Sequence, residues 1–135
     1  MSVALAVAQQ PLSFLAFDFG ARRVGVATGN SLTRTATPLT TVAVEGEARM
    51  AAIAALIAEW RPAALVVGVP RHPDGAAHAN TERARRFGRQ LKARFGLPVH
   101  EVDERYTTTD AIRAGAADLD AAAAAIILEQ HLAGL

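Results

Sequence analysis

Residues 15–28 (LAFDFGARRVGVAT) form a hydrophobic segment that one carboxylate, Asp18, interrupts. Apolar residues surround Asp18 as they would in a buried strand, and residues 24–28 alternate larger and smaller side chains as a returning strand would. Between these two runs, residues 20–22 have the composition of a tight turn. The pattern predicts a β-hairpin with Asp18 near the end of its first strand.

The segments that follow predict a third strand, a helix and a buried strand. Residues 35–44 are rich in β-branched residues, and Pro38 among them favours an edge strand or a bulge. Residues 47–60 place apolar side chains on one helical face, and Pro62 ends that pattern. Residues 63–69 are continuously apolar, which is typical of a parallel strand covered on both faces.

The second half of the chain continues to alternate helices and strands. It predicts, in order, a loop over residues 70–77, a helix over 78–95, a strand over 97–102, a polar loop over 103–109, a short helix from Thr107 or Thr108 to Arg113, and a helix over 118–132. This order of elements indicates an α/β fold with a mixed five-stranded sheet. We expect the first three strands to be antiparallel, the first strand to be central, and helices to cover both faces.

Length and composition limit the class of protein. The chain has 135 residues, so we expect one domain over residues 13–135, preceded by a disordered extension over residues 1–12. The apolar patch in that extension is too short to span a membrane. The chain has no cysteine, which excludes disulfides, thiolate metal sites and a cysteine nucleophile, and agrees with a cytoplasmic location. The formal net charge of +1 does not by itself indicate a nucleic-acid partner.

Acidic residues stand where predicted strands end or helices begin: Asp18, the pair Asp103 and Glu104, and the pair Asp118 and Asp120. The carboxyl ends of neighbouring parallel strands meet at one edge of a sheet, so these side chains can converge there. Carboxylates gathered without cysteines favour a hard cation such as Mg²⁺ or Mn²⁺ over zinc. The pattern therefore indicates a divalent-metal site at that edge.

Each of these carboxylates also has a purely structural interpretation. Asp18 can cap its own turn, although its apolar neighbours make an uncompensated carboxylate costly there. If the strand persists, Asp103 and Glu104 point to opposite sides, so only one reaches the site, and we favour Glu104. Asp120 can be an acidic residue in the first turn of a helix, with Asp118 as the cap.

Basic residues gather on the second long helix, away from its apolar stripe. Arg85, Arg86 and Arg89 lie there, and such a set is either a solvated helix face or a surface that contacts nucleic-acid phosphates. The sequence leaves both interpretations open.

Taken together, four segments resemble the RuvX/YqgF family, whose members are described as pre-16S ribosomal RNA nucleases and were earlier described as Holliday-junction-resolvase-like proteins. They are LAFDFGARRVGVATG, LVVGVPRHPDG, DERYTT and LDAAAAAIILEQHL, in the family's order. The resemblance spans nearly the whole chain after Pro11.

The resemblance implies an RNase H-like fold and a nuclease site that uses Mg²⁺ or Mn²⁺. Position by position, Asp18 matches the family's first-strand Asp, Glu104 lies in its Asp-Glu-Arg motif, and Asp120 matches the Asp that opens its last helix. These three would be catalytic metal ligands, with Asp18 bridging two ions and Asp103 as an alternative ligand. Arg23 would contact phosphates.

The same resemblance implies a supporting set around the metal ligands. Arg105 would hold phosphates at the rim beside Arg23, and the helix with Arg85, Arg86 and Arg89 would follow the backbone of a longer substrate. The Gly-x-Pro and Asp-Gly loop that contains Gly68, Pro70, Asp74 and Gly75 would face the substrate. One departure is the brief segment over residues 115–119, which has no Lys or Arg where many relatives have a longer basic loop.

We expect a nucleic-acid partner, either an rRNA precursor cut at its 5′ end, with ribosomal particles as further partners, or branched DNA. Junction cleavage would require a homodimer, whereas RNA trimming would suit a monomer. A non-catalytic RNA-binding assembly factor is the competing hypothesis, and the retained carboxylates argue against it. An actin-like ATPase shares the Asp-x-Gly hairpin, but the length rejects it because those proteins bind ATP between two such domains.

Overall fold

The computed structural model describes residues 11–71, 74, 79–104 and 118–135. Its strands are β1 (Ser13–Phe19), β2 (Val24–Asn30), β3 (Ala36–Val42), β4 (Ala64–Val69) and β5 (Val99–Asp103), and its helices are α2 (Gly46–Trp60), α3 (Thr81–Phe95) and α5 (Leu119–Ala133). The predicted extension over residues 1–12 lies almost wholly outside the described residues, as do Arg105 and the predicted short helix ending at Arg113.

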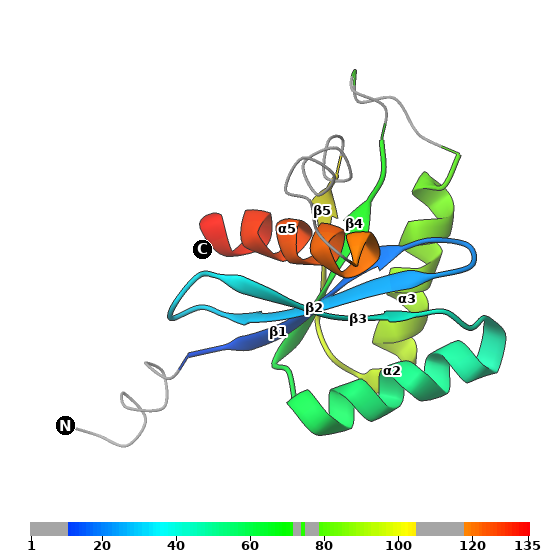
Figure 1. Ribbon diagram of the computed structural model, residues 1–135, viewed down its shortest axis with the longest axis horizontal. Coiled ribbons are helices and arrows are strands. Elements are labelled where there is room, and N and C mark those ends of the chain that lie inside the picture. Colours follow the sequence, from blue (N-terminus) through cyan, green and yellow to red (C-terminus); the bar gives the residue numbers. More distant parts are fainter. Residues whose placement is uncertain (1–10, 72–73, 75–78, 105–117) are drawn as a thin grey trace.

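The five strands form one mixed sheet in the order β3-β2-β1-β4-β5 (Figure 1). β1 is central: β1–β2 and β2–β3 are antiparallel pairs, whereas β1–β4 and β4–β5 are parallel pairs. Parallel neighbours need crossover connections, and α2 and α3 provide them. The arrangement confirms the predicted α/β fold, including the central position of the first strand.

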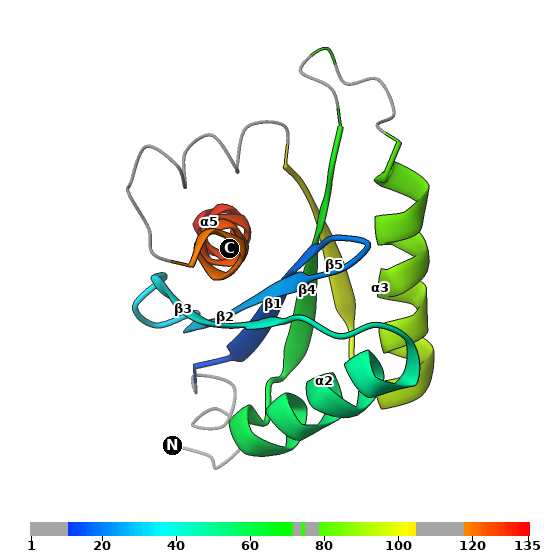
Figure 2. The same ribbon diagram turned by 45° about the vertical axis from the view of Figure 1, so that its right-hand side comes forward.

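Helices cover both faces of the sheet, as the sequence predicts. In Figure 2, α5 lies on one side of the strands, and α2 and α3 lie on the other. The side chains of β1 alternate between these two layers, so Leu15 and Phe17 pack toward α2 and α3 while Phe14 and Ala16 pack toward α5. By the same alternation, Asp18 belongs to the α5 face.

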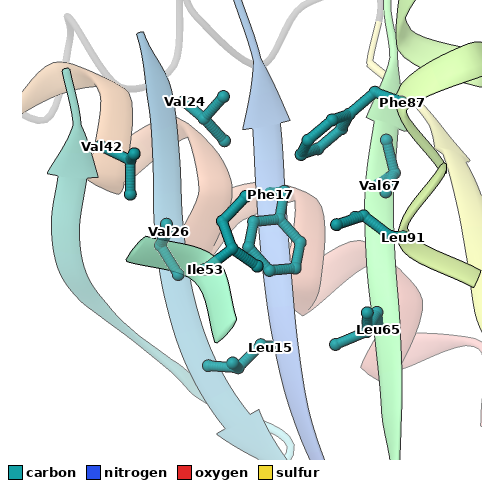
Figure 3. Close-up of a cluster of buried hydrophobic side chains, with 10 residues drawn as sticks. All are labelled: Leu15, Phe17, Val24, Val26, Val42, Ile53, Leu65, Val67, Phe87 and Leu91. Carbon is teal, nitrogen blue, oxygen red and sulfur yellow. The ribbon is translucent and has the colours of Figure 1, made fainter. Parts of the chain in front are cut away.

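The larger core lies between the sheet and the α2 and α3 layer, and Figure 3 shows its ten buried side chains. Leu15, Phe17, Ile53 and Leu91 are fully buried in it. Each such side chain contributes roughly 1.5–3 kcal/mol through the hydrophobic effect. This core packs against the face of β1 opposite to Asp18. The position of Asp18 is therefore set by well-packed neighbours.

Local signals explain where the helices begin and end. α5 begins after Asp118, whose side chain accepts a hydrogen bond of 3.0 Å from the backbone N–H of Ala121. α3 ends at Gly96, which adopts a left-handed conformation (φ 68°). α3 begins at Thr81, and the predicted start at His78 lies outside the described residues. The Thr81 hydroxyl donates to the Pro70 carbonyl oxygen (2.5 Å) and ties the first turn of α3 to the residue after β4. No helix among the described residues is long and apolar enough to cross a membrane.

Candidate functional site

Asp18 lies between two glycines in the sheet. It pairs with Gly25 of β2 on one side and with Gly68 of β4 on the other. All three positions face α5, because paired residues in neighbouring strands share a face. The absence of side chains at both neighbours leaves space around the Asp18 carboxylate, and other groups of the protein occupy that space.

Glu104 fills the space above Gly68. Its backbone N–H donates to the Val69 carbonyl oxygen at 3.2 Å, so the chain stays beside β4 for one residue after β5 ends. A Cβ atom built on Gly68 would lie 2.8 Å from Glu104 Oε2. The Glu104 carboxyl group leans over this glycine and forms a side-chain hydrogen bond with Asp18. The structure thus brings together the first two of the three predicted metal ligands.

Gly25 admits the first turn of α5. A Cβ atom at Gly25 would lie 1.8 Å from the backbone oxygen of Asp120, a distance that no side chain can accommodate. The next strand along, β3, holds the same end of the helix, because the Thr41 hydroxyl donates to Asp118 Oδ1 at 2.7 Å. Two contacts therefore place the start of α5, and with it Asp120, at the edge of the site.

The Asp18 and Glu104 pair is electrostatically unfavourable when both groups are ionised. Burial and, after it, the negative charge of Asp18 together raise the pKa of Glu104 to about 9. Burial also raises the pKa of Asp18 to about 6, although its hydrogen bond with Glu104 opposes that shift and the charge of Asp120 adds to it. The pair therefore keeps a shared proton near neutral pH, and it behaves as one coupled unit.

Asp120 lies at the edge of this pair and forms an ion pair with Arg23, with 3.3 Å between Arg23 Nε and Asp120 Oδ2. Among the residues that the structure describes, no three His, Cys, Asp or Glu side chains are close enough together to hold a metal ion. The three predicted ligands thus share one end of the sheet, but only two of them are in contact.

Asp103 occupies the other face of the sheet. Strand alternation places it on the side of α3, where its side chain is exposed, and its charge adds to the rise in the pKa of Glu104. The opposite orientations of Asp103 and Glu104 agree with the prediction from the sequence. The geometry therefore favours Glu104 as the group that faces Asp18.

The predicted arginine set lies on α3, which covers the face opposite to the Asp18 carboxylate (Figure 2). Arg85 forms an ion pair with Glu101 (3.6 Å), and Arg89 forms one with Glu82 (2.7 Å). Arg86 is exposed. The structure does not bring these three side chains to the carboxylate pair, so a role in substrate binding stays a prediction.

Sequence reasoning missed two residues that shape the site, Gly25 and Thr41. A glycine inside a strand signals a close backbone approach, and this signal was present at Gly25. Thr41 had no comparable signal, because a threonine in a strand is ordinary. Its role depends on α5 returning to the sheet 77 residues later in the chain.

Comparisons with known proteins identify the family of this chain. The model of a family described as "RuvX: Holliday junction resolvase" matches residues 12–134. The chain belongs to the RuvX family. A RuvX relative from Polaromonas sp., named "Putative pre-16S rRNA nuclease", is 67% identical over 123 residues, which are 91% of this chain and 89% of the relative. Another with the same name, from Albidiferax ferrireducens, is 64% identical over 126 residues, which are 93% of this chain and 81% of that one.

The fold of this RuvX family member is similar to that of Thermus thermophilus RuvC. The solved complex of RuvC with a Holliday junction substrate has a TM-score of 0.59 and 17% identity, and the match covers 91% of this chain and 95% of RuvC. A second RuvC structure matches with a TM-score of 0.53 and 15% identity over the same shares. At this identity the likeness establishes the fold alone, and it supports the predicted RNase H-like class.

The donor set at the site suits a hard divalent cation. Every candidate ligand is a carboxylate, and in the described part of the chain no cationic side chain forms an ion pair with Asp18 or Glu104. Two buried carboxylates that must share a proton lack a positive charge, which a Mg²⁺ or Mn²⁺ ion would supply. Asp120 is near enough to influence Asp18 electrostatically. The residues present therefore fit such an ion.

Proposed function

We propose that this protein is a nuclease that depends on a divalent metal ion and matures the 5′ end of pre-16S rRNA. The observation that carries the proposal is the buried contact between Asp18 and Glu104, because two carboxylates facing each other without a cation reduce the stability of the fold. Such a pair is typical of a functional site. The names of the relatives support RNA as the substrate. The family description names a Holliday junction resolvase, which makes branched DNA the alternative.

In this proposal Asp18, Glu104 and Asp120 hold the metal. A bound Mg²⁺ or Mn²⁺ would activate water for attack on a phosphodiester and stabilise the leaving oxygen. The chain's own contribution is positioning. The packing of β1 in the core fixes the position of Asp18. The hydrogen bond from the Glu104 backbone N–H to the Val69 carbonyl oxygen fixes the position of Glu104. The Asp118 cap and its bond to Thr41 fix the first turn of α5.

Arg23 is the phosphate contact that the geometry favours. Its side chain is 65% exposed and stands at the end of the turn that follows Asp18. A hollow of about 610 Å³ opens beside it, lined by Gly20, Ala21, Arg22, Arg23 and Asp120. An arginine can bind a phosphate through two parallel hydrogen bonds, so this hollow suits the backbone of a nucleic acid. Such a contact positions a strand and does not read its sequence.

The proposal is tested by incubating the purified full chain with Mn²⁺ and either a 5′ precursor of 16S rRNA or a four-way DNA junction. We expect cleavage of the rRNA precursor by the wild type and none by Asp18→Asn. Glu129→Gln, which neutralises an exposed carboxylate near the far end of α5, is the matched control and should cut like the wild type. Cleavage of the junction alone would replace RNA by branched DNA as the substrate. Undiminished cleavage by Asp18→Asn would refute the assigned site.

A further inference from the structure

The backbone of Asp120 is closely packed, whereas its side chain is partly exposed. The close approach to Gly25 and the cap at Asp118 fix the backbone of the first turn of α5. The side chain is 30% exposed and is directed to Arg23. The backbone of Asp120 lies against Gly25, which is the residue of β2 that pairs with Asp18. Asp120 therefore stands beside the site while its carboxylate is paired with Arg23.

Arg23 stands between two hollows. One is the hollow of about 610 Å³ described above, and the other, of about 420 Å³, is lined by Arg23, Thr41, Asp118, Leu119 and Asp120. Both Arg23 and Asp120 line both hollows, so their ion pair forms part of the wall between them. A phosphate group entering either hollow meets the guanidinium group of Arg23 while that group is bound to Asp120.

The ion pair is weak enough to be exchanged. With Arg23 at 65% and Asp120 at 30% exposure, it belongs to the class of solvent-accessible ion pairs, which contribute little to stability because water and salt screen them. A phosphodiester offers the guanidinium group two acceptor oxygens, and a divalent cation offers the carboxylate a stronger partner. A phosphate that binds Arg23 therefore releases Asp120 for the cation, and a cation that binds Asp120 releases Arg23 for the phosphate.

We propose that Arg23 withholds Asp120 from the metal site until a substrate phosphate engages Arg23, so that phosphate binding and metal binding favour each other. This inference rests on the proposed function, because it takes Asp120 as a metal ligand. It adds a second role to Arg23, which acts on the metal site through Asp120 besides contacting the substrate. By linkage, the effect is reciprocal, so metal binding also raises the affinity of Arg23 for phosphate.

The proposal predicts that removing the Arg23 side chain, which pairs with Asp120, strengthens Mn²⁺ binding more than removing another arginine of the same turn. Mn²⁺ affinity of the full chain is measured by isothermal titration calorimetry without nucleic acid, for the wild type, Arg23→Ala and Arg22→Ala. Arg22 is the matched control, because it is an exposed arginine of the same turn and forms no ion pair among the described residues. We expect Arg23→Ala to bind Mn²⁺ roughly twofold to fivefold more tightly than Arg22→Ala, the range that one exposed ion pair allows.

A double-mutant cycle with Asp120→Asn separates the exchange from a general charge effect. In the Asp120→Asn background, Arg23→Ala should bind Mn²⁺ with the same affinity as Arg22→Ala. A gain that persists there, or equal affinities for the two single variants, would overturn the exchange while leaving the metal site in place. If the wild type binds no Mn²⁺, the metal site of the proposed function fails, and the exchange fails with it.

Discussion

Replacing Glu104 by Gln should stabilise the metal-free protein. The Gln amide can donate a hydrogen bond to the Asp18 carboxylate, as the protonated acid does, so the contact is kept while the ionisable group is removed. In the wild type, burial and the charge of Asp18 raise the pKa of Glu104 from 4.5 to about 9. The folded protein therefore holds a proton that the unfolded chain releases over that range.

The sign of the effect follows from this difference in bound protons. A carboxyl group whose pKa is raised by folding costs nothing below its unfolded value, and its cost grows as the pH rises toward the folded value. One extra bound proton corresponds to about 1.4 kcal/mol per pH unit. Between the ordinary pKa of 4.5 and pH 7, the loss of stability amounts to roughly 3 kcal/mol. This figure is an upper limit, because the folded protein can relax around the charge.

Urea unfolding in EDTA at pH 5, 7 and 8.5 measures the effect. We expect Glu104→Gln and wild type to be nearly equal in free energy of unfolding at pH 5, and the variant to be more stable by roughly 1–3 kcal/mol at pH 7 and by more at pH 8.5. Glu129→Gln controls for the loss of one surface carboxylate. Equal stabilities at pH 8.5, or a difference that does not grow with pH, would refute the assignment of a shared proton to this pair.

Three further substitutions test how the site is built. Gly25→Ala should lower the free energy of unfolding by at least about 2 kcal/mol, because its Cβ would overlap the Asp120 backbone; urea unfolding with a loss below about 0.5 kcal/mol would contradict the close approach. Thr41→Val should cost about 1 kcal/mol through the lost bond to Asp118, and the cost should vanish in an Asp118→Ala background. Arg49→Met should lower the free energy of unfolding by roughly 1–3 kcal/mol, because the guanidinium of this residue, which is only 7% exposed, donates to the Ala21 and Val44 carbonyl oxygens. Unchanged thermal unfolding would show that these hydrogen bonds do not stabilise the turn after Asp18.

Much of the fold could be predicted because its signals are local. The alternation around Asp18, the continuous apolar run of β4 and the helical spacing of α2 are properties of short segments, and each segment forms the predicted element. The Asp118 cap was also predictable, because a capping side chain bonds to a backbone group three residues along the chain. The position of Asp18 among apolar residues was also visible in the sequence, because it depends only on neighbouring positions in the chain.

The arrangement of the site depends on contacts between distant segments, and only the tertiary structure decides those. Gly68 and Glu104 meet because β4 and β5 pair in one particular register, and Gly25 meets Asp120 because α5 returns to β2. The sequence showed three carboxylates, but only the packed structure shows that two of them lie together while Asp120 pairs with Arg23. Local patterns determine the elements, whereas the register and the packing of the last helix determine which charges touch.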